Sequence, residues 1–540
     1  MNILVAGAWP YANGSLHVGH LAGILAGDVI ARYHRAKGDN VLYVSGSDCH
    51  GTPISLRAAH EKVHPSQITT KYHNEFEECF KRLGFSYDLY SRTDAPFHVE
   101  TVQIILKQIN HNGYIYEREV EQLYCEKCET YLADRYIEGA CPFCGNMARG
   151  DQCDSCGSIL NANDLIDSKC KICDSTPALK KINQLFFQLS AYQDYISSGL
   201  EQAQYWRENA IQTTKRYLNE GLVDRVISRN IDWGIPIPIN GYEDRSLYVW
   251  FDAVLGYLRD VMELAEEKAF DWKDFWNKDM ISYYVHGKDN IPFHTVIFPA
   301  LLASQGINSF PTRIVSNEYL TLEGRKISTS QNWAVWLPHL IKNYDPDVIR
   351  YYILSNAPEK RDSDFSWREF LNANNSELLG AWGNLVNRTL MFINNIFDYQ
   401  IPNKEMHPEL REEIRSLFSA IGTQIEHGNI KKSIKDVFTF IRKMNKYFDE
   451  EKPWITVKDD LDKSQSVIFH CAEAIANIAI LLNPFLPATS SIILGWFNIA
   501  RPDWFYHELG KGLKLPKVQP LYRKLDKKII EEELNLMNRK

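Results

Sequence analysis

The chain has 540 residues, of which 45% are hydrophobic and 24% are charged, and its formal net charge is −8 at pH 7. This length predicts about three or four domains, and the composition is ordinary for a folded globular protein. The negative charge argues against nonspecific binding of polyanions by the whole surface, so any nucleic acid would contact local basic patches. The N-terminus has no basic leader, and the longest apolar stretch, residues 475–486, is interrupted by Asn477, Asn483 and Pro484. We therefore expect a cytoplasmic protein without a membrane segment.

The N-terminal segment has the pattern of a strand, a polar turn and a helix. The apolar run Ile3 to Ala8 predicts the strand. Apolar residues at helical spacing follow at Leu21, Ile24, Leu25, Val29 and Ile30. The turn between them contains Ser15, the expected N-cap, and then His17 and His20. Both imidazoles fall on one face of the first helical turns and can reach one phosphate at the helix N-terminus, although an isolated pair of this kind is more often a surface pair or a stray metal ligand.

Two blocks of alternating strands and helices predict a parallel α/β domain in two halves. The first block covers residues 1–117 and includes a second expected strand at 40–45. The second covers residues 181–318, where polar helices return the chain and Ile281 to His286 is the expected strand. We expect a Rossmann-like parallel-sheet catalytic domain that is split by an insertion at residues 118–180.

The insertion contains eight of the 11 cysteines of the chain, arranged as four C-x-x-C pairs. The pairs are Cys125 and Cys128, Cys141 and Cys144, Cys153 and Cys156, and Cys170 and Cys173. This repeated spacing fits tetrahedral zinc. Disulfides are disfavoured because nothing directs export, and a redox C-x-x-C normally occurs once. Eight thiolates imply two zinc sites, and these would be structural because every coordination position is filled.

The pairing of these cysteines is open from spacing alone. The short connection between Cys144 and Cys153 favours an inner site. That inner site would consist of Cys141, Cys144, Cys153 and Cys156, which leaves Cys125, Cys128, Cys170 and Cys173 for an outer site.

A second short motif, Leu322-Glu-Gly-Arg-Lys-Ile-Ser-Thr-Ser330, follows the second α/β block. Glycine and hydroxyl residues around Arg325 and Lys326 suit a mobile loop that closes a cation over a polyphosphate, and a solvated turn is the alternative. Further along the chain, from about residue 345, the strand pattern fades. Periodic segments at 378–397, 410–427 and 434–448 predict an all-α bundle over residues 371–540.

The two motifs in this order resemble the HIGH and KMSKS signatures of the class I aminoacyl-tRNA synthetases. Four further segments look like the methionyl-tRNA synthetase family: Ala8-Trp-Pro-Tyr11-Ala-Asn-Gly, Gly46-Ser-Asp48-Cys-His-Gly-Thr-Pro, Val249-Trp250-Phe-Asp-Ala253-Val-Leu-Gly-Tyr257 and His286-Gly-Lys-Asp289-Asn-Ile-Pro-Phe-His294. The resemblance spans the whole chain. It implies activation of methionine with ATP and Mg²⁺ to methionyl-adenylate and pyrophosphate, and then transfer of methionine to the 3′-terminal ribose of initiator and elongator methionine tRNA.

The resemblance also implies the nested zinc pairing, a KMSKS-type loop and stem-contact region at 319–370, and an anticodon-binding role for residues 371–540. One departure from the family pattern stands in the signature loop, where Thr329 replaces the second lysine. A hydroxyl cannot supply a point charge, so the task falls on Lys326, helped by Arg325.

The methionine pocket follows from the resemblance and from the chemistry of the ligand. A polarizable, unbranched thioether suits aromatic walls. Asp48 would hold the α-ammonium group, and Trp250 and Tyr257 would enclose the side chain. Without the motifs, core packing would be favoured for these two aromatic residues, which lie seven apart on a helix. The expected methionine-binding residues are Ala8, Trp9, Tyr11, Asp48, Trp250, Ala253, Tyr257 and His294.

The expected catalytic residues are His17, His20, Arg229 and Lys326. The expected ATP-binding residues are His17, Gly19, His20, Asp289, Lys326 and Ser328. Asp289 is the candidate for the ATP ribose because a carboxylate accepts two hydroxyl hydrogen bonds. The resemblance implies that Arg229, in Ser228-Arg-Asn-Ile-Asp-Trp-Gly, is a phosphate or carboxylate clamp. A surface ion pair is the alternative for either residue.

Trp454 is expected to bind the anticodon, since unstacked bases stack on aromatic rings and bond to amide and guanidinium groups. Asn384 and Arg388 match the anticodon-reading positions of the family, so the resemblance implies that they bind the anticodon as well. Basic residues between 431 and 446 could bind phosphates, although such a run is more often a solvated helix face. Some members of the family carry a C-terminal dimerising, tRNA-binding extension, whereas this chain stops in a charged, helix-like tail at Lys540, so we expect a monomer.

Two other classes of protein stay open. One is another class I synthetase: the leucine, isoleucine and valine enzymes carry a large editing insertion, and the cysteine enzyme holds zinc with an open coordination position in its pocket. The other is a nonenzymatic zinc-knuckle RNA-binding protein, which would have no use for His17, His20 and Lys326.

Overall fold

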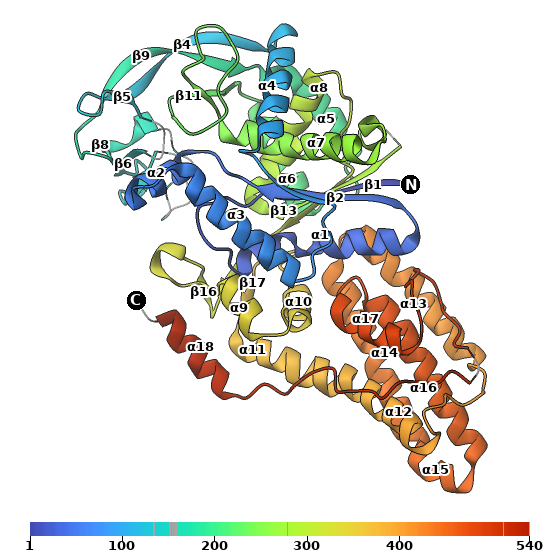
Figure 1. Cartoon of the computed structure of the whole chain (residues 1–540). Coiled ribbons are helices and arrows are strands. Elements are labelled where there is room, and N and C mark those ends of the chain that lie inside the picture. The colour runs from blue at the N-terminus through green and yellow to red at the C-terminus, as the bar shows by residue number, and fades with distance from the viewer. Residues whose placement is uncertain are drawn as a thin grey trace.

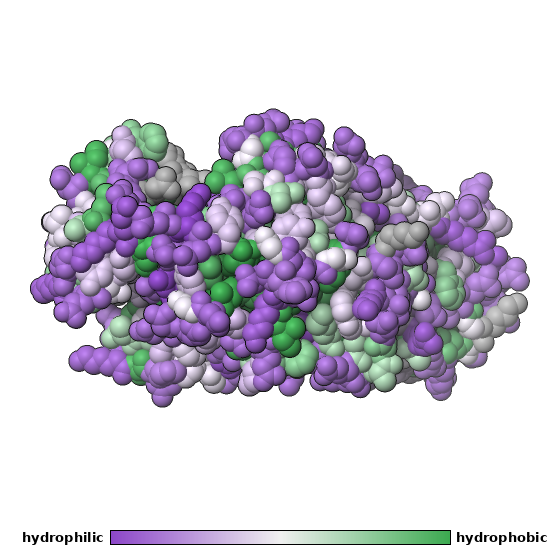
Figure 2. Space-filling model, turned by 90° about the horizontal axis from the view of Figure 1, so that it is seen from above, coloured by the Kyte–Doolittle hydropathy of each residue, from purple (hydrophilic) through white to green (hydrophobic). Residues whose placement is uncertain are grey.

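The structure, a computed structural model, describes residues 1–132, 136–150, 153, 155, 160, 162–277, 279–510 and 512–538. Figure 1 shows the α/β part, the cysteine-rich insertion that interrupts it and the helical part, with the bundle below the sheet and the insertion at the upper left. The face seen from above is mainly hydrophilic, with hydrophobic side chains in small groups (Figure 2).

A five-stranded parallel sheet, in the order β14-β13-β1-β2-β3, forms the centre of the α/β part. Its strands are β1 (Asn2–Gly7), β2 (Asn40–Ser47), β3 (Leu89–Arg92), β13 (Ile281–Gly287) and β14 (Arg313–Asn317). The strands expected near residues 3, 40 and 281 are confirmed. The order of strand addition reverses between β1 and β13, and open α/β sheets bind ligands at the carboxyl ends of strands flanking such a point.

Helices cover both faces of this sheet (Figure 1). On one face α1 (Val18–Lys37) packs against β1 and β13, and on the other α7 (Val249–Lys268) packs against β2 and α4 (Pro96–His111). Burial on both faces explains the almost uninterrupted apolar run of β1. The other helices of this part are α2 (Thr52–Glu61), α3 (Pro65–Arg82), α5 (Gln193–Glu201), α6 (Glu208–Glu220) and α8 (Phe298–Ser304). Short strands are β10 (Arg225–Val226), β11 (Ser228–Arg229) and β12 (Ser246–Leu247).

The insertion leaves and rejoins the α/β part through one antiparallel ribbon. β4 (Ile115–Cys125) pairs with β9 (Ala178–Phe187) along its length, from Ile115 opposite Phe187 to Tyr124 opposite Ala178. The strands at its far end are β5 (Thr130–Tyr131), β6 (Ile137–Ala140), β7 (Met147–Arg149) and β8 (Ile166–Cys170). The module has its own small core, built around its cysteines, Leu123, Leu132 and Ile137.

The signature loop lies on a small sheet between the α/β part and the bundle. Its strands, in the order β16-β15-β17, are β15 (Leu320–Leu322), β16 (Arg325–Lys326) and β17 (Ser363–Phe365). The helices that follow are α9 (Leu337–Asn343), α10 (Pro346–Ser355) and α11 (Trp367–Asn372).

The remaining chain is the expected all-α bundle. A π-helical segment, Ala373–Gly383, leads into α12 (Asn384–Ile396), α13 (Pro408–Glu426), α14 (Ile430–Glu451), α15 (Pro453–Asp459), α16 (Leu461–Leu482) and α17 (Pro487–Trp496). Among the described residues, α16 is the one helix long and apolar enough to cross a membrane, and 83% of its most apolar window is buried inside the protein. That burial is typical of a central bundle helix.

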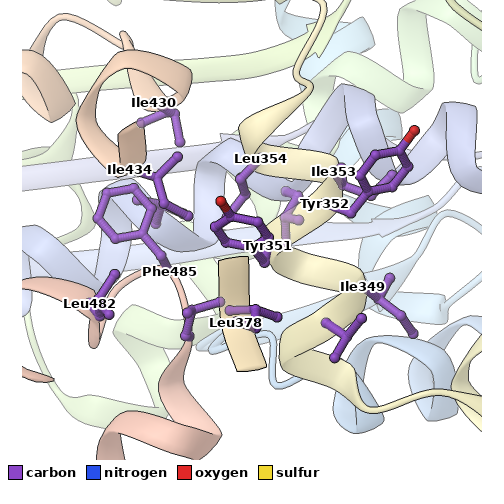
Figure 3. Close-up of a cluster of buried hydrophobic side chains, with 14 of the residues drawn as sticks. Ile349, Tyr351, Tyr352, Ile353, Leu354, Leu378, Ile430, Ile434, Leu482 and Phe485 are labelled. Atoms are coloured by element: carbon purple, nitrogen blue, oxygen red, sulfur yellow. The ribbon is translucent and has the colours of Figure 1, made fainter. Parts of the chain in front are cut away.

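One hydrophobic core joins the bundle to the lower face of the sheet. Figure 3 shows Tyr351 and Leu354 of α10 beside Ile434 of α14 and Phe485 after α16. The fully buried Arg350 crosses the same boundary: it forms an ion pair with Asp28 of α1 (2.7 Å) and donates to the carbonyl of Phe485 (2.7 Å). The last helix, α18 (Lys528–Asn538), returns to pack against α11.

Candidate active site

The chain enters α1 at His17. Val18 N–H donates to the Val335 carbonyl (3.0 Å) and Leu337 N–H donates to the Leu16 carbonyl (2.8 Å), so the backbone at His17 stays extended. His17 is therefore the N-cap, and the prediction of Ser15 was wrong because this bridge holds the chain extended beyond Ser15.

The two histidines of the motif cap the helix and each other. Nδ1 of His17 accepts from Gly19 N–H (3.1 Å), and Nδ1 of His20 accepts from His17 N–H (3.1 Å). The surrounding protein lowers the pKa of His17 well below its usual value, and the neighbouring His20 adds to this shift. The pKa of His20 is lowered to about 4 by the same surroundings, although its side chain is exposed at the cavity surface. Since each neutral ring uses Nδ1 as an acceptor, its proton is on Nε2. Both rings line the cavity as neutral donors.

A cavity of about 900 Å³ opens at the carboxyl ends of β1, β2 and β13. It brings together all eight residues expected to bind methionine and both motif histidines, and we call it the methionine cavity after that expectation. Asp48 follows β2, and its backbone bridges to Tyr11. Burial raises the pKa of Asp48 well above its usual range, and the charge of Asp252 raises it further. The ionised form of Asp48 is therefore disfavoured in the empty cavity, and a cationic group bound there would favour the carboxylate.

Aromatic rings form the cavity wall. Trp250 stacks on Phe293, with ring centroids 3.9 Å apart, and Tyr257 hydroxyl lies 2.9 Å from His294 Nε2. His294 Nδ1 lies 2.8 Å from the Asn290 carbonyl and must be the donor there, so its Nε2 accepts from Tyr257. Burial lowers the pKa of His294 to about 4, which keeps this arrangement neutral.

Trp9 is held in its place by two glycines. A Cβ on Gly256 would lie 2.4 Å from the Trp9 ring, and a Cβ on Gly46 would lie 2.6 Å from it. The ring contacts Tyr257 edge-on at 6.3 Å between centroids. The position of Trp9 therefore depends on residues without side chains on β2 and α7.

A neighbouring cavity of about 510 Å³, which we call the ATP cavity after the expected ligand, is lined by five of the expected ATP residues: His17, Gly19, His20, Asp289 and Lys326. Asp289 also lines the methionine cavity and accepts a hydrogen bond from Tyr319 hydroxyl. A Cβ on Gly19 would lie 2.9 Å from the His17 ring, so glycine permits the approach of this ring to the helix.

The signature loop begins with a tight hairpin. Glu323 and Gly324 both have positive φ (49° and 73°), as a two-residue type I′ turn requires, and β15 pairs with β16 across them. Lys326 is exposed at the rim of the ATP cavity, and Arg325 stacks over Trp333, 4.3 Å from the ring centroid. Ser328 pairs with Trp333 through backbone hydrogen bonds and is not among the residues lining these two cavities, whereas Thr329 lines the methionine cavity.

Arg229 lies in a third cavity, of about 790 Å³, and not with the motif histidines. Its guanidinium group stacks over Tyr248 at 4.3 Å and donates to the Ser228 carbonyl (3.1 Å). Tyr11, Trp250, Phe293 and Asp289 line both this cavity and the methionine cavity.

The cysteines gather in the nested arrangement. One cluster contains Cys125, Cys128, Cys170 and Cys173, and the other contains Cys141, Cys144 and Cys153. Cys156 lies outside the described residues. The Sγ atoms of Cys125 and Cys173 are 3.4 Å apart, those of Cys128 and Cys170 3.9 Å, and those of Cys144 and Cys153 3.6 Å. Thiolates at about 2.3 Å from a tetrahedral zinc are separated by roughly 3.8 Å, so both clusters could hold this ion.

The three expected anticodon residues meet at one end of the bundle. Trp454 is 45% exposed and stacks on Phe448, and the Arg388 guanidinium lies over the same ring at 4.2 Å. Asn384 donates to Asn445 (3.3 Å). On α14 the basic side chains pair with acidic neighbours, as on a solvated helix face; these are Lys432, Arg442, Lys443 and Lys446.

Several residues that line these cavities were not predicted from the sequence, among them Phe293, Tyr319 and Trp336. Phe293 stands inside one of the recognised segments, and Tyr319 comes two residues after β14, so proximity to a motif or a strand end could have indicated them. Trp336 contacts the site through its bridge to His17, which no local pattern predicts.

Comparisons with known proteins agree with this arrangement. A family model described as tRNA synthetases class I (M) matches residues 3–390, and one described as the anticodon binding domain of methionyl tRNA ligase matches residues 401–535. The chain is 55% identical over 540 residues to methionine–tRNA ligase 1 of Alkaliphilus oremlandii (strain OhILAs), covering 100% of both. It is 50% identical over 538 residues to methionine–tRNA ligase of Bacillus cereus (strain 03BB102), covering 99% of this chain and 98% of that protein.

A solved structure has the same fold. Methionyl-tRNA synthetase of Mycobacterium tuberculosis bound by methionyl-adenylate matches with a TM-score of 0.81 over 97% of this chain and 100% of that one, at 23% identity.

Proposed function

Because the chain belongs to the class I methionyl-tRNA synthetases, we propose that the residues lining the cavities at the carboxyl ends of β1, β2 and β13 carry both steps of its reaction. The chain is a methionine–tRNA ligase, which activates methionine with ATP and transfers it to methionine tRNA. The resemblance inferred from the sequence is thereby confirmed, and the other two classes of protein are excluded.

In the first step a carboxylate oxygen of methionine bonds to the α-phosphorus of ATP, and the bond from this phosphorus to pyrophosphate breaks. Asp48 binds the α-ammonium group and so fixes the carboxylate. The neutral Nε2–H groups of His17 and His20, with the N-terminus of α1, stabilise charge that develops on the phosphate. The protein supplies no nucleophile.

Lys326 closes over the β- and γ-phosphates from the hairpin, and Asp289 accepts hydrogen bonds from the ribose hydroxyls. Mg²⁺ that enters with ATP would neutralise part of the phosphate charge. Arg229, which lines the adjoining third cavity, acts as a clamp on a phosphate or carboxylate group. The observation that carries this assignment is that His17, His20 and Asp289 line two cavities that share residues, at the ends of β1 and β13 and the start of α1. Asp48 lines the first of these cavities from the end of β2, and Lys326 of β16 lines the second.

Pyrophosphate exchange without tRNA tests the assignment. We expect exchange with methionine, and not with leucine, isoleucine, valine or cysteine. Lys326→Ala should lower it about a hundredfold or more, since a cation on the transferring phosphates is worth several kcal/mol. Lys342→Ala, an exposed lysine of α9, is the matched control. Unchanged exchange in Lys326→Ala would remove this lysine from the mechanism.

The cysteine clusters are assigned two structural zinc ions. The inner site is Cys141, Cys144, Cys153 and Cys156, and the outer site is Cys125, Cys128, Cys170 and Cys173. The Sγ separations and the thiolate donor set support zinc. With four thiolates each, the ions would hold the module together and take no part in the reaction.

We assign anticodon binding to Trp454, Arg388 and Asn384. The exposure of the Trp454 ring supports this assignment. We divide the chain by these functions. Residues 1–117 and 181–318 are the two halves of the catalytic domain, and residues 118–180 between them are the zinc module. Residues 319–370 are the loop and stem-contact region, and residues 371–540 are the anticodon-binding bundle. We assign a cytoplasmic monomer, and light scattering tests the monomer.

A further inference from the structure

The third cavity has a wall in common with the methionine cavity. The two cavities share Tyr11, Pro53, Trp250, Asp289 and Phe293, and the stacked rings of Trp250 and Phe293 stand between them. With a volume of about 790 Å³, the third cavity is large enough for a substrate of its own.

One face of α6 lines this third cavity. The cavity residues of α6 are Asn209, Gln212, Thr213, Arg216 and Tyr217, which recur at intervals of three and four. This spacing puts all five on one side of the helix. The face is polar, cationic and aromatic, whereas the residues of α6 that are buried, Ala210 and Thr214, lie elsewhere on the helix.

The charges of the cavity favour an anion. Its lining has three cationic side chains, Arg216, Arg229 and Lys288, and two carboxylates, Asp289 and Glu318, so cations exceed carboxylates by one. Lys288 pairs with Glu318 (2.6 Å) and with Asp362 (3.2 Å), and Asp289 accepts a hydrogen bond from Tyr319. Arg216 is exposed on α6, and Arg229 is held across from Tyr248. Two guanidinium groups therefore stand in the same cavity as the rings of Tyr217, Tyr248 and Trp250.

We propose that the third cavity receives the single-stranded 3′-terminal nucleotides of the tRNA, with Arg216 on a backbone phosphate and the terminal bases against the aromatic rings. Arginine binds phosphate through paired hydrogen bonds, and unpaired bases stack on aromatic side chains. The proposal rests on the proposed function, because ATP occupies the cavity on the Lys326 side and leaves this side for the second substrate.

The position fits the transfer step. The ribose hydroxyl oxygen bonds to the carbonyl carbon of methionyl-adenylate, the bond from this carbon to the AMP phosphate oxygen breaks, and the hydroxyl proton leaves with AMP. The incoming ribose must reach the carbonyl beside Trp250, at the boundary between the two cavities. The stacked Trp250 and Phe293 rings thus separate the tRNA end from the methionine side chain.

The test separates the two steps. Arg216→Ala should leave methionine-dependent pyrophosphate exchange at the parent level, because this step needs no tRNA. Transfer from preformed methionyl-adenylate should fall about tenfold or more, as expected for one lost charge-assisted hydrogen bond. The defect should persist on a minihelix that has the acceptor end and lacks the anticodon, and the salt dependence of KM for tRNA should become shallower.

Lys215→Ala is the matched control, since it removes the same charge from the next residue of α6, which is exposed and does not line the cavity. It should transfer at the parent rate, and Arg216→Lys should recover part of the loss. Parent-level transfer in Arg216→Ala, an equal loss in Lys215→Ala, or an equal loss of exchange would each overturn the proposal. A parent protein without methionine-dependent exchange would instead overturn the proposed function.

Discussion

His17 and Trp336 lie opposite each other in an antiparallel backbone bridge, with their ring centroids 6.2 Å apart. Trp336 follows the signature loop, so this bridge ties the end of the loop segment to the start of α1. The histidines and Lys326, which are distant in sequence, thereby share one anchor. Movement of the loop is confined to the residues between β15 and this bridge.

The raised pKa of Asp48 predicts a pH-dependent KM for methionine. The ammonium group needs the carboxylate, and the raised pKa leaves Asp48 protonated at a pH well above the range where an exposed aspartate titrates. As the pH falls through the raised pKa, KM for methionine should rise about tenfold per pH unit. Asp48→Asn should raise KM and abolish this dependence. A flat pH profile in the parent would contradict the role of Asp48.

Gly256→Ala should weaken methionine binding, because its Cβ would lie 2.4 Å from the Trp9 ring. Overpacking costs about 1–3 kcal/mol, so KM for methionine should rise about tenfold. Gly495→Ala in α17 is the control, since its Cβ would have nothing within 4 Å and alanine favours a helix. Steady-state exchange kinetics measure both, and equal effects would show that Trp9 tolerates displacement.

The nested cysteine clusters predict two zinc ions per chain and one in Cys170→Ser. A chelator should unfold the module and leave the two larger cores intact, because the module has a separate core. Atomic absorption gives the zinc content, and circular dichroism follows the rest of the fold. Cys79→Ala, a buried cysteine outside both clusters, should keep both ions. Two ions in Cys170→Ser would show that zinc binding does not require Cys170.

Trp454→Ala should raise KM for tRNA about tenfold to a hundredfold in aminoacylation, because stacking of one base on an aromatic ring is worth about 1–3 kcal/mol. Pyrophosphate exchange should not change. Phe505→Ala removes another exposed ring, 59% exposed, and should affect neither reaction. A tRNA KM equal to that of the parent in Trp454→Ala would place anticodon reading elsewhere.

The docking of α18 should depend on pH through His339. Its Nε2 lies 2.9 Å from both carboxylate oxygens of the buried Glu533, and this hydrogen bond raises the pKa of His339. The ion pair between His339 and Glu533 contributes its full stabilisation below the ordinary histidine pKa of about 6.5. This contribution is lost as the pH rises through the raised pKa of His339. The difference in Tm between the parent and His339→Gln should therefore shrink as pH rises. NMR titration should show the pKa of His339 falling in Glu533→Gln, and an unchanged pKa would refute the coupling.

Most of the fold was predictable because it depends on local periodicity and strand-end rules. The strand at Ile281 to His286, the helix that carries Trp250 and Tyr257, and the bundle all follow from apolar spacing. The aromatic and acidic residues of the methionine cavity follow from motif resemblance, and the structure brings them together.

Features set by distant partners were not predictable. The N-cap moves from Ser15 to His17 because Val335 and Leu337 pair with the preceding backbone. Arg229 faces another cavity because Tyr248 takes its guanidinium group. The charged tail is a helix, as expected, but its contact with His339 and Tyr344 through Glu533 has no signal in the local sequence.

The buried Arg350 determines how the chain can be divided. Its guanidinium group binds Asp28 of α1 and the carbonyls of Leu83, Pro484 and Phe485, so residues from both ends of the chain satisfy one charge. A fragment ending at residue 370 would leave Arg350 without the last two partners and would expose the apolar side of α10 to water. We therefore expect the α/β part and the bundle to behave as a single folding unit that melts in one cooperative transition.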